Sequence, residues 1–521
     1  MSRKRKSDYR IGRDNVQLFG MDLHNPVFFI SALLILAFVV GTLIFPAAAN
    51  RALAGAKNWS IQHFEWLFMA GANLFVLFCL VLIVLPVGKI RLGGPGARTE
   101  FSTLSWFAML FAAGMGIGLM FWSVAEPVAH FTGWHGTPLD IEPYSSPAAD
   151  LAMGAVMVHW GLHAWAIYAV VALSLAFFTY NRGLPLTIRS AFYPIFGERC
   201  WGWVGHIIDT LAVLATMFGL ATSLGLGARQ ASAGFHFLFA TPDTLGMQIA
   251  IITCVTFAAV ISVLRGLHRG VKLLSNFNMS MALLLLLFVI AVGPGLGFFA
   301  GMARTGGNYA AAVLPLSNWV GREDTEFLHN WTVFYWAWWI SWSPFVGMFI
   351  ARVSRGRTVR EFLIAVLLVP TVIAIVWMTT FGGTGLEQAM QGRGALAEGI
   401  GNEALALFQM LAELPLTTIT SLLGILLVLV FFVTSSDSGS LVIDSITAGG
   451  KLNAPKPQRI FWAVMEGLVA AALLYGGGRQ ALEALQAGAI ASGLPFTLVL
   501  LLMCLSLYRG LVAEGRSSGA V

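Results

Sequence analysis

The sequence predicts an all-α integral membrane protein with about twelve transmembrane helices. Of its 521 residues, 57% are hydrophobic and only 11% are charged, whereas soluble domains carry about 25% charged residues. Apolar segments long enough to cross a bilayer recur along the whole chain. The connections between these segments alternate between those rich in Lys and Arg and those poor in them. These observations place most of the chain in lipid.

The expected spanning segments follow one another along the chain. Each is a run of roughly 20 or more predominantly apolar residues, the length that crosses a hydrocarbon core. The segments are residues 27–46, 63–87, 104–130, 151–180, 203–230, 246–264, 277–301, 328–351, 359–382, 415–447, 458–476 and 488–508.

The basic residues support this division. With both termini on the cytoplasmic side, 24 of the 31 Lys and Arg residues fall in cytoplasmic segments and six in outer loops. Such a bias follows the positive-inside rule. The N-terminus, MSRKRKSDYRIGRDN, is basic, but no short apolar segment with a cleavage site follows it. We therefore interpret it as a retained cytoplasmic tail and not as a signal peptide.

Composition also excludes several classes of function. The net charge of +6 is spread among loops and does not indicate a nucleic-acid partner. The four cysteines lie far apart and predict neither a disulfide framework nor a metal cluster. No nucleophile with a paired base, no His/Glu metal spacing and no phosphate-binding loop stands out, so no enzyme or cofactor is expected.

The glycine-rich segment AAGMGIGLMFWSVAEP (112–127) interrupts one apolar run. Gly114, Gly116 and Gly118 stand at alternate positions, and each costs a helix roughly 1 kcal/mol relative to Ala. They predict an unwound point, which lipid tolerates only where the backbone lines a cavity or is buried in protein. Unwound backbone at mid-membrane can bind a small ligand or ion. Alternatively, the glycines only allow another helix to approach closely.

Two segments concentrate aromatic residues. On a helix with about 100° per residue, HWGLHAWAIY (159–168) places Trp160, Trp165 and Tyr168 within roughly 140° of one side. In WTVFYWAWWISWSPF (331–345), five rings fall within roughly 80° with Trp339 beside them: Trp331, Tyr335, Trp338, Trp342 and Phe345. Desolvated aromatic faces attract a quaternary ammonium by cation–π interaction. The alternatives are ordinary packing and, for Trp331, an interfacial belt.

The segment FFVTSSDSGS (431–440) interrupts a further apolar run with hydroxyl groups. Residues 434–440 contain five hydroxyls and one carboxylate, more than bonding back to the same helix usually explains. Hydroxyl and carbonyl oxygens suit a hard cation. Asp437 is an intramembrane carboxylate and a functional candidate by default, although it equally suits the cap of a half-helix.

Three further residues are candidates for carrying protons. Glu126 ends the glycine-broken segment, where a cap or a gate contact is the alternative. His159 and His163 titrate near neutral pH, although a packing role with satisfied hydrogen bonds is the better explanation for both.

Together these segments resemble the betaine–choline–carnitine transporter family of bacterial secondary transporters. The matching segments are GMGIGLMFWSVAEP (114–127), HWGLHAWAIY (159–168), LPLTIRSAFYPIFG (184–197), FGLATSLGLG (218–227), WTVFYWAWWISWSPFVGMFIARVSRGRTVREF (331–362) and TSSDSGSLVIDSITAGGK (434–451). The likeness extends over nearly everything from the first spanning segment to the last.

The resemblance implies an architecture of two leading helices followed by two inverted five-helix repeats of the leucine-transporter type, commonly assembled as a homotrimer in a bacterial inner membrane. The expected divisions are a basic cytoplasmic tail (1–26), the leading helices (27–103), the first repeat (104–301), a linker with an interfacial helix (302–327), the second repeat (328–508) and a short cytoplasmic tail (509–521). The polar segment 384–414 is expected to cap the outer mouth.

The resemblance also implies a binding site. Its aromatic box falls on Trp160, Trp165, Tyr168 and Trp339, with Trp338, Trp342 and Phe121 lining the site and its path, and with Gly114, Met115 and Gly116 facing the polar end of the substrate. Its shared sodium site falls on backbone oxygens of Ala112, Met115 and Phe431 and on the hydroxyls of Thr434 and Ser435.

A second sodium site of the family is incomplete here. Sodium-coupled members have two threonines one helical turn apart near Phe345, and this chain has Thr216 but Leu220 one turn later. Leucine offers no side-chain oxygen, so we expect this site to be lost. Proton-coupled choline carriers of the family also look apolar at this place, which leaves sodium and proton coupling both open.

The expected function is cation-coupled import of glycine betaine or choline by alternating access. The alternatives are proton-coupled choline uptake, transport of ectoine or dimethylsulfoniopropionate, carnitine exchange and, outside this class, a passive channel or an integral-membrane enzyme. Because the C-terminal tail is short, we expect weak osmotic gating from it. The basic N-terminus is expected to bind anionic lipid at roughly 1 kcal/mol per basic residue.

Overall fold

A computed structural model describes residues 7–114, 116–265 and 270–518 of the chain. Every expected spanning segment coincides with a helix or with a pair of helices. They are α1 (Val27–Ile44), α2 (Pro46–Val84), α3 (Thr103–Gly114) with α4 (Ile117–Thr132), α5 (Ser146–Trp160) with α6 (Leu162–Tyr180), α8 (Trp203–Phe239), α9 (Leu245–Arg265), α10 (Gly270–Val292), α13 (Val333–Val353), α14 (Val359–Trp377), α17 (Thr417–Thr447), α18 (Lys456–Gly477) and α19 (Ala481–Ser518).

Shorter elements connect these helices. They are η1 (Pro86–Lys89), η2 (Pro138–Asp140), η3 (Ile188–Phe192), α7 (Tyr193–Phe196), η4 (Gly197–Trp201), η5 (Gly295–Gly297), α11 (Phe298–Ser317), α12 (Thr325–Phe327), η6 (Leu328–Thr332), η7 (Met378–Gly382), α15 (Gly383–Met390), η8 (Ala395–Glu398), η9 (Glu403–Leu405), α16 (Ala406–Ala412) and η10 (Gly478–Gln480).

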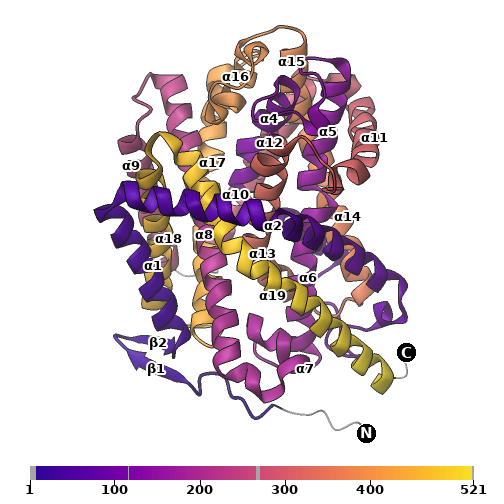
Figure 1. Cartoon of the computed structure of the whole chain (residues 1–521), viewed down its shortest axis with the longest axis vertical. Helices are drawn as coiled ribbons and strands as arrows, with labels where there is room; N and C mark the ends of the chain where they lie inside the picture. The colour runs from indigo at the N-terminus through magenta and orange to yellow at the C-terminus, as the bar shows by residue number, and fades with distance from the viewer. Residues whose placement is uncertain (1–6, 115, 266–269, 519–521) are drawn as a thin grey trace.

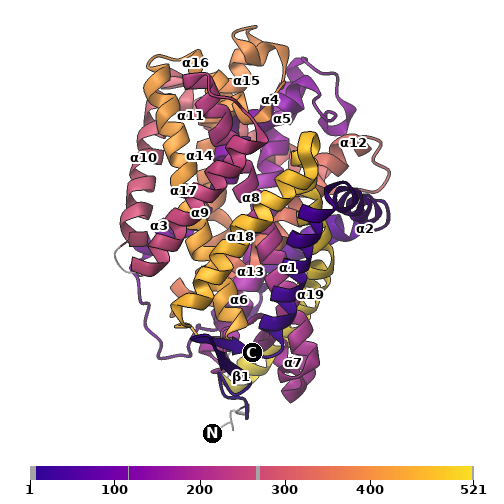
Figure 2. The same ribbon diagram turned by 90° about the vertical axis from the view of Figure 1, so that its left-hand side faces the viewer.

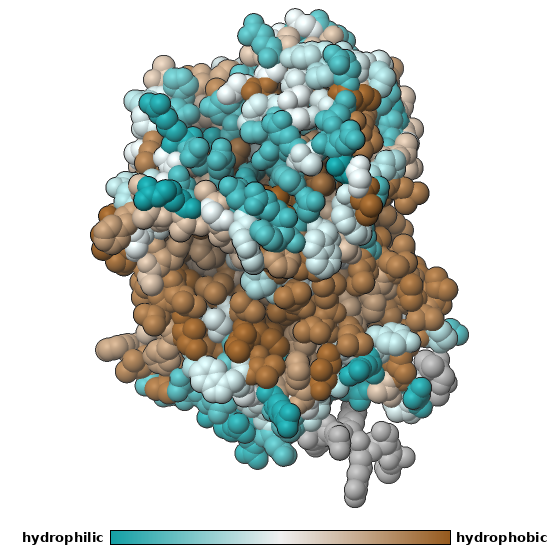
Figure 3. Space-filling model, in the orientation of Figure 1, coloured by the Kyte–Doolittle hydropathy of each residue, from teal (hydrophilic) through white to brown (hydrophobic). Residues whose placement is uncertain are grey.

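The long helices have the composition of membrane spans. Within the described residues, nine helical stretches are long and apolar enough to cross a bilayer, one of them containing both α18 and α19. The space-filling view shows a brown apolar surface across the middle of the molecule, between teal polar regions at its two ends (Figure 3). Leu77, Phe257 and Leu284, from three different helices, are among the exposed large apolar side chains. The chain is an all-α membrane protein.

Several boundaries differ from those expected. Helix α2 begins at Pro46, well before residue 63, because proline suits the first turn of a helix. Helix α19 continues to Ser518, so the expected tail 509–521 is mostly helical. The expected linker 302–327 contains a helix, α11, which begins earlier, at Phe298, and packs along α5.

The helices surround α13, which packs against α6, α8 and α19 (Figures 1 and 2). Both ends of the described chain lie at the bottom of Figure 1, and α15 and α16 lie at the top. These two helices come from the segment 384–414 and pack on α4. The expected cap therefore lies at the end of the molecule opposite the termini.

The N-terminal segment contains a β-hairpin that the sequence did not predict. Strands β1 (Asn15–Leu18) and β2 (Met21–His24) pair antiparallel across a two-residue turn at Phe19 and Gly20, both with positive φ. Positive φ at both positions matches the right-handed twist of a hairpin. The hairpin contacts the connection between α17 and α18, where Asp22 forms an ion pair with Lys451. Residues 7–26 are therefore a docked element and not a free tail.

Candidate functional site

The glycine-rich segment breaks a membrane helix, as predicted. Helix α3 ends at Gly114, α4 begins at Ile117, and Gly116 between them is extended. Met115, an expected contributor to the substrate and sodium sites, lies outside the described residues. Because α4 begins anew at Ile117, the backbone N–H groups of its first turn have no partner four residues earlier in a helix, in the place where the sequence suggested a ligand.

The glycines differ in what surrounds them. A Cβ on Gly118 would lie 2.5 Å from the Trp338 ring and 3.3 Å from that of Trp160, whereas a Cβ on Gly116 would meet nothing within 4 Å. Gly118 therefore permits close packing of indole rings, which was the alternative explanation for these glycines. Gly116 borders open space.

A second break occurs within the aromatic segment 159–168, which we expected to be one continuous helix. Helix α5 ends at Trp160, α6 begins at Leu162, and Gly161 between them has φ −95° and ψ −135°. The projection that put Trp160 and Trp165 on one helix was therefore wrong. A Cβ on Gly161 would lie 2.6 Å from the Met157 carbonyl oxygen and 2.8 Å from the Tyr309 hydroxyl, so only glycine fits there.

Five aromatic rings nevertheless come together at these breaks. Trp160 meets Trp339 edge to face with ring centroids 4.9 Å apart, and Tyr168 lies 6.1 Å from Trp339 and 5.5 Å from Trp165. Trp338 stacks on Trp339 at 5.0 Å. The Trp339 indole donates to the His159 carbonyl at 2.8 Å, which holds its ring against the end of α5. We call Trp160, Trp165, Tyr168 and Trp339 the aromatic box.

The box surrounds a small cavity of about 40 Å³. It is lined by Gly116, Gly118, Leu119, Trp160, Ala164, Trp165, Tyr168, Ser223, Trp338, Trp339 and Trp342. A water molecule needs about 10–15 Å³ of such space, so the cavity holds only a few waters. A quaternary-ammonium osmolyte is larger, and it fits only if the rings move apart.

Two described residues that were expected to line the site are not among these, and three lining residues were not expected: Leu119, Ala164 and Ser223. Phe121 is fully buried and packs edge to face on Trp122, and Gly114 belongs to the end of α3. Ser223 of α8 lines the cavity, and its hydroxyl donates to the Gly219 carbonyl at 3.4 Å. The same carbonyl accepts from Trp342 at 2.8 Å. The sequence signal for Ser223 is the FGLATSLGLG segment (218–227), one of the segments that carry the family resemblance.

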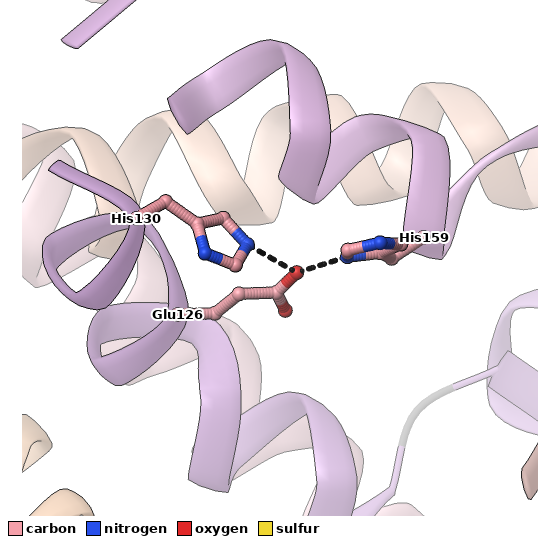
Figure 4. A group of neighbouring side chains, drawn as sticks. All are labelled: Glu126, His130 and His159. Carbon is pink, nitrogen blue, oxygen red and sulfur yellow. Dashed lines mark hydrogen bonds and ion pairs between the residues drawn. The ribbon is translucent and has the colours of Figure 1, made fainter. Parts of the chain in front are cut away.

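Glu126 anchors one wall of the box. Its Oε2 accepts hydrogen bonds from the Trp160 indole at 2.8 Å and from the Tyr335 hydroxyl at 2.5 Å. Figure 4 shows two imidazoles approaching its other oxygen, His159 Nδ1 at 2.7 Å and His130 Nε2 at 3.3 Å. The carboxyl group thus joins α4 and α5 to α13 and fixes the orientation of the Trp160 ring.

The Glu126, His130 and His159 group also has the donor set of a metal site. One ligand atom from each lies within 4.8 Å of the others, and imidazole with carboxylate suits zinc. However, both carboxylate oxygens already accept hydrogen bonds, and His159 Nε2 lies 3.0 Å from the Thr332 hydroxyl. The arrangement is a hydrogen-bond network complete without an ion, apart from the unpartnered His130 Nδ1.

A second cavity, of about 150 Å³, shares Trp342 with the first. It lies toward the end of the molecule that carries the termini, and its lining includes the three described candidate cation ligands Phe431, Thr434 and Ser435. The Thr434 hydroxyl donates to the carbonyls of Val430 at 3.0 Å and Phe431 at 3.2 Å. Ala112, on the expected opposite side of this site, lies in the last turn of α3.

Two residues of the second expected cation site, Thr216 and Leu220, pack within the helices. The Thr216 hydroxyl donates to the Ala212 carbonyl of its own helix at 2.7 Å, and Leu220 packs on Gly439, where a Cβ would be 2.2 Å from Leu220 Cδ1. Phe345 lines the second cavity with Trp342. Leu220 supplies no side-chain oxygen at this place, and the loss of the site stays a prediction.

The remaining proton candidates have structural partners. Asp437 forms an ion pair with Arg459 and accepts from the Ser262 hydroxyl at 3.0 Å. Because α17 continues unbroken from Thr417 to Thr447, the suggestion that Asp437 caps a half-helix was wrong. His163 lies 3.0 Å from the Asn73 side-chain oxygen and stacks on Trp336, as expected of a packing histidine.

Comparison with known proteins identifies this arrangement. The model of the betaine/carnitine/choline family of transporters matches residues 26–516. The chain is 60% identical to Glycine betaine transporter 1 of Vibrio parahaemolyticus over 98% of this chain and 97% of that one. It is 58% identical to a glycine betaine/proline/choline/ectoine transporter of the same organism, over 98% of this chain and 91% of the relative.

A more distant relative also aligns with this chain over nearly the whole length of both proteins. Glycine betaine transporter OpuD of Bacillus subtilis is 42% identical over 94% of this chain and 95% of its own. The matched family and these relatives are transporters and not enzymes. The chain belongs to the betaine/carnitine/choline family of transporters.

Proposed function

We propose that this chain imports a quaternary-ammonium osmolyte, glycine betaine or choline, driven by a cation gradient. The observation that carries the proposal is the aromatic box, where four rings from α5, α6 and α13 meet beside the Gly116 break. A trimethylammonium group cannot donate a hydrogen bond, and desolvated rings bind it by cation–π attraction. The names of the relatives above agree with this substrate class.

Transport follows from the two adjacent cavities. The box holds too little space for the substrate, so binding requires its rings to separate, and release requires Trp342 to move from between the box and the second cavity. Trp342 is held by one hydrogen bond, from its indole to the Gly219 carbonyl. Movement of α13 relative to α8 therefore opens the path, in an alternating-access cycle around a fixed site.

Cation coupling is assigned to the oxygens that line the second cavity. The Phe431 carbonyl and the hydroxyls of Thr434 and Ser435 supply hard oxygen ligands, and carbonyls of Ala112 and Met115 would complete the set from the α3 side. Sodium is the proposed ion. Since Leu220 offers no side-chain oxygen for a second sodium site with Thr216, one sodium per substrate is the expected stoichiometry, with proton-coupled choline uptake as the alternative.

We also propose the membrane in which the protein lies, its orientation and its partners. The distribution of Lys and Arg favours cytoplasmic termini in a bacterial inner membrane. A homotrimer and contacts of the basic N-terminus with anionic lipid are expected from the family resemblance and from charge. A related zwitterion such as ectoine is a second candidate substrate, because a relative 58% identical is named for ectoine and proline as well.

The test is uptake into proteoliposomes of labelled glycine betaine, choline and ectoine, each under an imposed sodium gradient at clamped pH and under a pH gradient without sodium. We expect accumulation of betaine or choline above the external concentration with sodium alone. Accumulation only with the pH gradient would assign the protein to the proton-coupled choline type. Equilibration without accumulation under both gradients would contradict a secondary transporter and indicate a channel.

A further inference from the structure

The carboxyl group of Glu466 lies in the middle of α18, where it has too few hydrogen bonds and, among the residues that the structure describes, no counter-ion to stabilise a negative charge. The residue is fully buried, and its Oε2 accepts one hydrogen bond, from the Ser436 hydroxyl at 2.8 Å. Its Oε1 is buried with no hydrogen-bond partner. An ionised carboxylate buried without a counter-ion costs several kcal/mol or more, so in this conformation the group is stable only with a proton.

The nearest cation is already paired with another acid. Arg459, two turns earlier on α18, forms an ion pair with Asp437 of α17 and also donates to the Asp437 carbonyl at 2.8 Å. Asp437 and Arg459 are the charged groups that face Glu466 from the described part of the chain. The other helices packed here present Leu220 from α8 and Thr256 from α9, the latter beside Gly467. One guanidinium therefore neutralises Asp437 and leaves Glu466 uncompensated.

The position of Glu466 connects it to the proposed cation site. Its Oε1 would lie 3.2 Å from a Cβ on Gly439, a position that the Leu220 side chain also contacts. Leu220 occupies the position at which, by the family resemblance, sodium-coupled members have a threonine. Ser436, the hydrogen-bond donor to Glu466, directly follows Ser435 on α17. The titratable carboxyl group of Glu466 thus lies close to Leu220, the apolar residue at the position of a cation ligand. It also contacts α17, the helix that carries the proposed ligands Phe431, Thr434 and Ser435.

We propose that Glu466 is a proton-binding site of the transport cycle, which holds a proton in the conformation described and exchanges it with water when α17 separates from α8 and α18. The exchange breaks the O–H bond of the carboxyl group and transfers the proton to water, leaving a carboxylate that accepts from Ser436 and the incoming water. The inference rests on the proposed function, since the proton exchange is tied to transport. It adds an ionisable site beside a place where the sequence predicts the loss of a sodium ligand.

The test compares the wild-type protein with E466Q and with E387Q, a control at an exposed glutamate of α15. The first readout is the infrared difference spectrum on adding glycine betaine or sodium to proteoliposomes. We expect a change in the carbonyl band of a protonated carboxyl group in the wild type and in E387Q, and loss of that band in E466Q. An unchanged band in E466Q would overturn the assignment.

The second readout is the pH profile of betaine uptake under a fixed sodium gradient. Glutamine keeps the shape of a protonated glutamate, so E466Q is expected to fold and to bind substrate, which tryptophan fluorescence checks. Its uptake is expected to lose the pH dependence of the wild type. A profile identical to that of the wild type would overturn the proposal. A wild-type protein that accumulates no quaternary ammonium compound would contradict the proposed function, whereas the infrared band reports on Glu466 without transport.

Discussion

The carboxylate of Glu126 accepts a hydrogen bond from the Trp160 indole at 2.8 Å, although the two residues lie 34 positions apart on different helices. This bond fixes the edge of one ring of the aromatic box, while the partner oxygen meets the imidazoles of His130 and His159 (Figure 4). The group proposed to attract the substrate is therefore oriented by a polar network, and the shape of the box depends on a residue that does not line it.

Substitution of Glu126 by glutamine should weaken substrate binding through Trp160. An amide has one oxygen in place of two, so at least one of the four donors around Glu126 loses its acceptor at a cost of about 1–3 kcal/mol. We expect a higher Kd for glycine betaine in E126Q, measured by tryptophan fluorescence, and a lower Tm. In a W160F background the same change should cost less, since the indole donor is already absent. Fully additive effects would contradict the role of this bond.

Alanine at two glycines of one segment should have different effects on stability. G118A places a Cβ 2.5 Å from Trp338, whereas G116A places one in open space. Overpacking costs about 1–3 kcal/mol, so G118A should unfold at lower temperature than the wild type, and G116A should not. Thermal unfolding of the purified proteins in detergent measures both. Equal stability of the two variants would show that the packing of Trp338 on Gly118 is unimportant.

Removal of hydroxyl groups should distinguish the two candidate cation sites. T434A and S435A are expected to raise the sodium concentration that gives half-maximal uptake, because both residues line the second cavity. T216A serves as the control, since Leu220 one turn later offers no side-chain oxygen to complete a cation site with Thr216. Measurement of uptake against sodium concentration compares the three. A shift for T216A as large as that for T434A would place the cation elsewhere.

The N-terminal hairpin should lose its docking as the pH falls. Burial, followed by the positive charges of Arg189 and His206, lowers the pKa of His24 to about 3, from an ordinary value near 6.5. Because the undocked histidine binds a proton more readily, the stability of docking is complete above about pH 6.5 and decreases toward pH 3. Hydrogen exchange of residues 15–24 should therefore accelerate at pH 4.5.

The matched variant for this prediction is H24N, which cannot titrate. Its hairpin should exchange at a rate that, after correction for intrinsic chemistry, does not change between pH 7 and pH 4.5. Equal protection of the wild-type hairpin at both pH values would contradict the coupling of His24 to docking.

The sequence predicted the membrane architecture and one of the two helix breaks. The break at Gly116 was predictable because three alternate glycines penalise a helix. The single Gly161 is ordinary in a spanning segment, and the close approach of the Met157 carbonyl and of Tyr309 explains it. The network at Glu126 was not predictable, because its partners come from positions up to 209 residues away. Likewise, pairing of Arg459 with Asp437, which isolates Glu466, depends on how α17 and α18 pack.

The β-hairpin was missed for a different reason. Its strands, NVQL and MDLH, alternate between polar and apolar residues, but they have only four residues each, too few for the pattern to stand out after the charged segment before them. Their stability comes from tertiary contacts, such as the bond from the Asn15 amide to the Ala448 carbonyl at 3.0 Å. Local sequence carries no signal of a contact with a residue 433 positions later.

The most direct test of the aromatic box is the affinity for glycine betaine of W339A, W339F and the exposed control W66A. Cation–π attraction of about 2 kcal/mol or more for a desolvated ring corresponds to a Kd raised roughly 30-fold when the ring is removed. We predict that loss for W339A, a smaller one for W339F, which keeps a ring, and none for W66A. An unchanged Kd in a folded W339A protein would contradict the account.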